Sequence, residues 1–197
     1  MSKTRELEAQ LEAAQNRHHL YRRITRQMTR VAPLGESLAT IVGYVADFME
    51  ADSCLLYLSA GEDLVLVAAR DPHPGAIGNV RLSPSEGLTG WVARERRMLS
   101  ITREAFSDPR FKFFSNLPED TYEAFLSTPV TARGRTFGVI NVQHRMPHAH
   151  TGDQMEVITS VGELIGCLVL LATSDEASVS FNYAELALSS LPVGQET

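Results

Sequence analysis

Residues 123–143 read EAFLSTPVTARGRTFGVINVQ, the best candidate for a pair of strands in the chain. Two apolar runs flank the sequence ARGR at 132–135, where Gly134 supplies the positive φ that a tight hairpin turn requires. The second run, 136–142, is rich in β-branched and aromatic residues, which favours a strand. The stretch therefore predicts a β-hairpin at the centre of an antiparallel sheet. Pro129 cannot donate a ladder hydrogen bond, so we expect its strand to be interrupted or irregular there.

Alternation along the second strand of this hairpin predicts which residues share a face of the sheet. Ile140 and Val142 belong to one face. Val139, Asn141 and Gln143 belong to the other.

Segments on both sides of the hairpin carry helical or strand patterns. Apolar stripes at spacings of three and four predict helices over about 38–49 and 153–172. A further helix begins near 85–87 and runs to about 96. Short apolar runs predict strands at 53–58, 64–69, 80–82 and 98–101. The order predicts an α/β fold: an antiparallel sheet of about five or six strands flanked by α-helices, with an N-terminal helical extension.

The N-terminal extension, residues 1–33, is expected to be a helix, because 3–30 contain neither Gly nor Pro and many good helix formers. A heptad seam runs along it at Leu7, Leu11, Ala14, His18, Tyr21, Thr25 and Met28. His18 and Thr25 make this seam weak. Two interpretations stay open: a coiled-coil arm that dimerises or transmits a signal, and a frayed N-terminal arm.

Composition places the chain among ordinary folded domains and excludes some partners. Of its 197 residues, 44% are hydrophobic and 21% are charged. No uninterrupted apolar run approaches the length of a membrane span, and the N-terminus is polar. We therefore expect neither association with a membrane nor a signal peptide. Cys54 and Cys167 sit in apolar runs, which suits reduced thiols of a cytoplasmic protein. The net charge of −6 argues against nucleic acid as a partner.

Residues 102–122 form a long connection with an aromatic character. It contains the sequence DPRFKFF at 108–114. Loops of this length inside a compact domain are usually functional or disordered, and three phenylalanines in four positions need something to bury against. The connection is therefore the first place to look for a binding site.

Several motifs in this order resemble those of a GAF domain. They are ADSCLLYL at 51–58, EGLTGWVA at 86–93, DPRF at 108–111, FLSTPV at 125–130 and RGRTFGVINVQ at 133–143. The resemblance covers about 34–173 and is most similar to the N-terminal GAF domain of nitrogen-related phosphoenolpyruvate–protein phosphotransferases and nitrogen-fixation transcriptional activators. Residues 174–197 are expected to form a flexible tail.

The resemblance implies a regulatory domain that binds a small molecule under the 102–122 loop and transmits the event through dimeric helices. The residues that would line the pocket are Trp91, Phe106, Asp108, Arg110, Phe111, Tyr122 and Thr128. Arg110 could hold a carboxylate or phosphate with two N–H groups, or it could pair with a neighbouring carboxylate. Asp108 could bind a ligand or cap the turn before Pro109. The aromatic residues could serve the core instead.

The expected partners are a small-molecule ligand of unknown identity, a second copy of the chain through its N-terminal and C-terminal helices, and a downstream signalling protein. A rival interpretation is a ligand-free dimerisation or docking module, whose pocket is filled by its own Phe111 or Phe114. A second rival is an enzyme similar to the free methionine-(R)-sulfoxide reductases. That chemistry needs pocket thiols, and Cys54 and Cys167 are not near the loop, so we expect no catalytic activity.

Three histidines follow the hairpin at His144, His148 and His150. Three imidazoles within seven residues could bind Zn²⁺ or Ni²⁺. Pro147 lies between them, on a segment that the pattern predicts to be a surface loop. We therefore expect three solvated histidines and no metal site.

Overall fold

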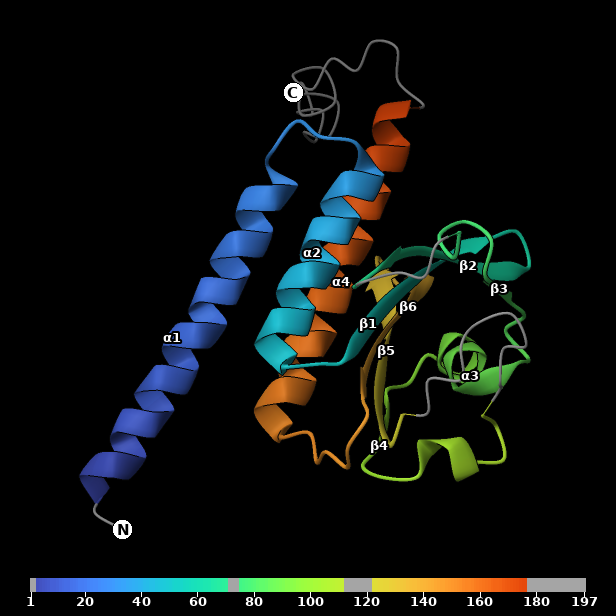
Figure 1. The fold of residues 1–197 in the computed structure, drawn as a ribbon. Coiled ribbons are helices and arrows are strands. Elements are labelled where there is room, and N and C mark those ends of the chain that lie inside the picture. Colours follow the sequence, from blue (N-terminus) through green and yellow to red (C-terminus); the bar gives the residue numbers. More distant parts are fainter. Residues whose placement is uncertain (1–2, 71–74, 112–121, 177–197) are drawn as a thin grey trace, which may run out of the picture.

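The computed structural model describes residues 3–70, 75–111 and 122–176. Figure 1 shows a sheet with helices on both of its faces. The elements are α1 (Lys3–Met28), α2 (Leu34–Met49), β1 (Ser53–Ala60), β2 (Asp63–Ala69), β3 (Arg81–Leu82), α3 (Gly87–Glu95), β4 (Leu99–Ile101), the 3₁₀ turn η1 (Ala105–Ser107), β5 (Ala124–Ala132), β6 (Arg135–His144) and α4 (Gly152–Glu176).

The six strands form one antiparallel sheet in the order β3-β2-β1-β6-β5-β4. The predicted hairpin is β5 and β6, and its turn residues Arg133 and Gly134 both have positive φ, at 48° and 72°. This conformation fits a two-residue turn between twisted strands. The predicted α/β architecture and the central hairpin are confirmed.

The expected interruption at Pro129 is wrong. β5 runs continuously from Ala124 to Ala132, and Pro129 pairs with Val139. The irregularity lies one step later, between Val130 and Thr131. β4 pairs with β5 only as far as Ser127, so on that side Pro129 lies at an edge, where proline is tolerated.

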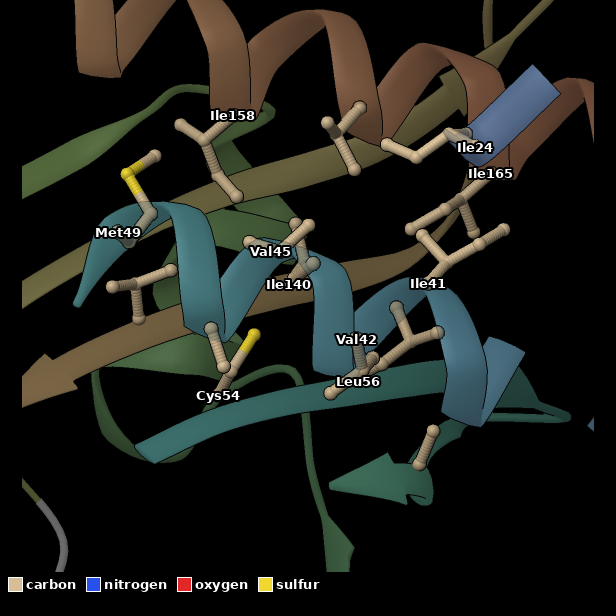
Figure 2. Close-up of a cluster of buried hydrophobic side chains, with 14 of the residues drawn as sticks. Ile24, Ile41, Val42, Val45, Met49, Cys54, Leu56, Ile140, Ile158 and Ile165 are labelled. Atoms are coloured by element: carbon tan, nitrogen blue, oxygen red, sulfur yellow. The ribbon is translucent and has the colours of Figure 1, made fainter. Parts of the chain in front are cut away.

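The main hydrophobic core lies between the sheet and the two helices α2 and α4. α2 packs on β1 and β2, while α4 packs on β5 and β6. Figure 2 shows Val45 from α2 beside Ile140 from β6, and Ile41 from α2 beside Ile165 from α4. Each fully buried aliphatic side chain of this kind contributes about 1.5–3 kcal/mol to folding. α3 covers the opposite face of the sheet, near β5 and β6.

α4 approaches the sheet closely because two glycines face β5. A Cβ at Gly162 would lie 2.8 Å from the carbonyl oxygen of Pro129, and one at Gly166 would lie 2.4 Å from that of Thr131. Within the described part of the chain, Gly152–Ala172 is the one helical stretch whose length and composition would suit a membrane span, and 39% of that window is buried. A core helix of this composition passes the same test.

α1 lies outside α2 and docks through its C-terminal half. Leu20 and Ile24 are buried in the main core, and the Gln27 side chain donates a 3.3 Å hydrogen bond to Ser37 of α2. Each buried residue of this stripe lies one position before a residue of the predicted heptad seam. The seam residues Leu7 and Leu11 are 56% and 59% exposed. α1 is therefore a docked helix with an apolar end, rather than a wholly separate arm.

Candidate functional site

The sheet face beneath α3 carries a buried polar network. The Ser127 hydroxyl of β5 donates to Asn141 Oδ1 of β6 at 2.6 Å, and Asn141 Nδ2 donates to Thr89 Oγ1 of α3 at 2.8 Å. All three residues are buried. A polar group in such a place must be hydrogen-bonded, because an unpaired one costs about 1–3 kcal/mol. The network therefore ties α3 to the two strands of the hairpin and fixes the orientation of Asn141.

Gln143 extends this polar surface along β6. It is buried, lies opposite Phe125 of β5 and Ser53 of β1, and shares the face of Asn141. Among the described residues, its Oε1 has no hydrogen-bond partner. An amide oxygen in that position is an acceptor that a bound molecule can use. Sequence alternation placed Asn141 and Gln143 on this face, but they were not selected as site residues.

At the edge of this face, three candidate residues come together. The Arg110 guanidinium donates to both carboxylate oxygens of Asp108, at 2.8 Å from Nε and 2.7 Å from a terminal nitrogen. The Arg110 backbone N–H also donates to Asp108, at 2.9 Å. The guanidinium carbon lies 4.8 Å from the centre of the Trp91 ring on α3, a distance that allows a cation–π contact.

This clamp sets the charge state of the pair. Hydrogen bonding from the Arg110 side chain holds the pKa of the Asp108 carboxyl below its usual value, and burial opposes this shift. The same hydrogen bond raises the pKa of Arg110. Both groups are therefore charged at neutral pH. The interpretation in which Arg110 pairs with a nearby carboxylate is confirmed, and that carboxylate is Asp108.

The remaining candidate residues take different positions. Phe111 packs against Leu88 and Phe125, on the α3 side of the sheet. Phe106 is half-buried in η1, and Tyr122 is buried with the Arg145 guanidinium 5.9 Å from its ring centre.

The assignment of Thr128 to this pocket is wrong. Thr128 is buried and points to α4, because a Cβ at Gly162 would lie 3.4 Å from its methyl group. It therefore lies on the face of the sheet opposite α3. Alternation along β5 puts Thr128 on the face opposite its neighbour Ser127, which bonds to Asn141 beneath α3.

A shallow hollow of about 250 Å³ lies elsewhere, between the β1–β2 turn and the end of α3. Its lining includes Glu62, Asp63, Arg94 and Arg96. None of the seven candidate residues, all of them described, belongs to that lining. The segment 112–121, which holds Phe114 and the rest of the aromatic loop, lies outside the described residues.

The two cysteines lie away from the α3 face. Cys54 on β1 points into the main core beneath α2 (Figure 2), and burial raises the pKa of its thiol to about 12. Cys167 is exposed on α4. A thiol enzyme needs an accessible thiolate with a second thiol close by. The placement of these two thiols does not provide that arrangement.

A six-stranded antiparallel sheet, with two long helices on one face and a short helix over a polar patch on the other, defines a common regulatory sensor fold. A family model described as the GAF domain matches residues 33–169, and the chain belongs to this family. The resemblance inferred from the sequence motifs is thereby confirmed.

Solved structures and curated relatives agree with this assignment. The GAF domain of a phosphoenolpyruvate–protein phosphotransferase from Acinetobacter is 26% identical, with 82% of this chain and 98% of that chain covered and a TM-score of 0.72. The corresponding domain from Coxiella burnetii is 23% identical, with 84% and 99% covered and a TM-score of 0.77. The phosphoenolpyruvate-dependent phosphotransferase system protein of Escherichia coli K12 is 26% identical over 114 residues, or 57% of this chain.

The chain spans 15% of the length of the curated relatives it matches. A free methionine-R-sulfoxide reductase from Neisseria meningitidis also aligns, at 15% identity with 85% of this chain and 94% of that chain covered and a TM-score of 0.67. At that identity the likeness shows a shared fold.

Proposed function

We propose that this chain is a non-enzymatic GAF sensor that binds a small metabolite carrying a carboxylate or phosphate on the α3 face of the sheet, beneath the 102–122 connection. The observation that supports it is the clamp formed by Asp108, Arg110 and Trp91 at the edge of a buried polar face. In a cytoplasmic regulatory pathway, a downstream signalling protein would read the bound state.

The chemistry of the clamp suits an anionic ligand. Asp108 uses two of the five N–H groups on the Arg110 side chain, and that side chain is 37% exposed. The remaining edge of the guanidinium can donate to a ligand carboxylate or phosphate in paired fashion. Trp91 holds the guanidinium plane, and the Gln143 amide oxygen offers an acceptor for a ligand hydroxyl or amine on the same face of the sheet.

The same proposal includes a homodimer through the terminal helices. Leu7 and Leu11 of α1 are exposed, and so is Leu171 of α4. α4 contacts β5 through Gly162 and Gly166, so a change in β5 would be passed to α4 without intervening flexible side chains. Sedimentation of a variant that lacks residues 1–30 tests the α1 contribution: a dimer that persists unchanged contradicts it.

Ligand binding is tested by a thermal-shift screen with amino acids, nucleotides and inorganic anions, followed by calorimetric titration of each hit. A ligand at 100 times its Kd stabilises the folded state by about 2.7 kcal/mol. We expect stabilisation of the wild type and of the control variant Arg97→Gln, whose side chain is exposed at the end of α3, and loss of stabilisation in Arg110→Gln. A hit that stabilises Arg110→Gln equally contradicts the assigned role of Arg110.

The rival function, a ligand-free dimerisation or docking module, also has a specific observation in its favour. Phe111 packs against the cluster that contains Leu88 and Phe125, so at least one aromatic ring of the connection occupies space on the α3 face. If no compound raises the melting temperature while the chain remains dimeric, this rival replaces the sensor proposal.

A further inference from the structure

The chain from the end of β6 to the start of α4 folds back so that three histidine rings meet. The His144 and His148 rings stack with their centres 4.0 Å apart and their planes at 12°. The His150 ring lies 4.7 Å from that of His148, edge-on, and 5.2 Å from that of His144. One ligand nitrogen from each ring can be chosen so that all three lie within 4.8 Å of one another.

Two of these rings are buried, contrary to the expectation of three solvated histidines. His144 is 5% exposed and His150 is 6% exposed, while His148 is half-buried. Among the residues that the structure describes, His144 Nε2, His148 Nε2 and both ring nitrogens of His150 have no hydrogen-bond partner. A buried polar atom without a partner costs about 1–3 kcal/mol, so four such atoms in one place favour a bound ion or water there.

The backbone holds the three histidines in place. The His148 N–H donates to the Thr102 carbonyl at 3.0 Å, and the Glu123 N–H donates to the His144 carbonyl at 2.9 Å. Immediately after His150, Thr151 and Gln154 exchange hydrogen bonds in a capping box that starts α4. The rings therefore converge from an ordered segment, which lowers the cost of organising a site.

We propose that His144, His148 and His150 form a binding site for one divalent transition-metal ion of the Zn²⁺ class. Imidazole nitrogens suit zinc, nickel and copper, and three of them with a fourth position open to a water is a common zinc arrangement. Nitrogens at 2.0–2.1 Å around a tetrahedral zinc lie roughly 3.3 Å apart, so the ligand nitrogens need to close by about 1.5 Å at most. The stacked rings of His144 and His148 also need to tilt apart, so that their in-plane lone pairs converge on one ion. The ion would enter past His148, because this ring is half-buried while the other two are buried.

The electrostatic surroundings agree with this assignment. Burial, and then the neighbouring His148 and His144, lower the pKa of His150 to about 4. Burial and His148 also lower the pKa of His144, against the opposing influence of Asp52 and Glu50. Asp52 and Glu50 therefore bring negative charge toward a site that would hold a dication.

The metal site is separate from the proposed ligand site. His144 shares the strand face of Ile140 and Val142, which pack against α2 and α4. The ion would join the end of β6 to the start of α4, and so stiffen the helix that the dimer proposal uses. Failure of the metal proposal therefore leaves the sensor proposal standing, and the reverse also holds.

The test is a calorimetric titration of tag-free, chelator-stripped full-length protein with Zn²⁺, with Mg²⁺ as a probe that imidazole does not favour. We expect one Zn²⁺ per chain for the wild type and for the control His19→Gln, whose ring is exposed on α1. Loss of an outer-shell partner alone weakens metal sites by about 10–100-fold, so His148→Gln or His150→Gln should weaken binding by at least about 100-fold. Binding well below one equivalent, or equal binding by wild type and His148→Gln, overturns the proposal.

A second measurement covers the case in which a variant does not fold. Imidazole nitrogen NMR of the wild type should show one nitrogen of each of three histidines shifting together on addition of one equivalent of Zn²⁺. Shifts confined to His18 and His19, or no shift at all, overturn the proposal without any substitution.

Discussion

Asp108 is the residue that orients Arg110 and occupies two of its N–H groups. We predict that Asp108→Asn lowers the free energy of unfolding by about 1 kcal/mol or less, because a partly exposed ion pair contributes little. The same change should raise affinity for an anionic ligand, since it removes a negative charge beside the proposed anion site. Urea unfolding and calorimetry of the two proteins with any anionic hit measure both effects; weaker ligand binding by Asp108→Asn contradicts the role given to Arg110.

The Asp108–Arg110 pair also predicts a pH dependence. The folded-state pKa of Asp108 lies below its usual value of 3.8, so the folded protein favours the ionised form. The stability it contributes is present above the unfolded pKa and is lost as the pH falls through the folded pKa. The difference in melting temperature between wild type and Asp108→Asn should therefore shrink below about pH 4. A difference that grows on acidification would contradict the assignment.

Cys54 and Cys167 should differ sharply in reactivity toward a disulfide reagent. Cys54 is buried with a pKa raised to about 12, whereas Cys167 is exposed on α4. The thiolate is the reactive form, so the reagent should modify only Cys167 in the native protein. Cys54 should react only after the protein is unfolded. Mass spectrometry after a short labelling pulse locates the label. Rapid native labelling of Cys54 would reopen the reductase interpretation.

At the scale of elements, the packing of α4 on β5 depends on glycine. Gly166→Ala would place a methyl group 2.4 Å from the Thr131 carbonyl oxygen, and Gly43→Ala on α2 would meet nothing within 4 Å. We predict that Gly166→Ala destabilises the fold by about 1–3 kcal/mol through overpacking. The control Gly43→Ala should stabilise by up to about 1 kcal/mol through helix propensity. Equal effects in denaturant unfolding would mean that α4 does not sit this close to the sheet.

The two ends of α1 should behave differently. Ile24 is fully buried in the core, so Ile24→Ala is expected to cost about 2–5 kcal/mol of unfolding free energy. Leu11→Ala removes an exposed side chain, so it should change that free energy little but weaken self-association. Chemical denaturation and sedimentation of both variants check this division. A dimer insensitive to Leu11→Ala would leave the N-terminal half of α1 without its assigned role.

For the whole molecule, periodicity predicted most of the elements and the central hairpin, because burial of one face imposes the spacing of apolar residues. It did not place the docked face of α1: the pattern favoured a seam through Leu7 and Leu11, while tertiary packing selected Leu20 and Ile24. Packing of a helix depends on the surface opposite it, which a single segment does not contain.

The site was less predictable because its partners are distant in sequence. The Asn141–Thr89 hydrogen bond joins residues 52 positions apart, so no local sequence pattern predicts it. The Asp108–Arg110 pair is local, so the sequence could suggest it. The histidines are also local, but their burial depends on how the segment returns toward α4 and Thr102.

Binding of a small anionic molecule to the α3 face can be observed by NMR of the full chain. Pools of amino acids, nucleotides and inorganic anions would be added while the Arg110 Nε–H and the side-chain amides of Asn141 and Gln143 are observed. We expect that at least one pool shifts the Arg110 and Gln143 signals together, and that Arg110→Gln abolishes the Gln143 shift. Signals that stay unchanged with every pool, or shifts confined to residues off the α3 face, would contradict it.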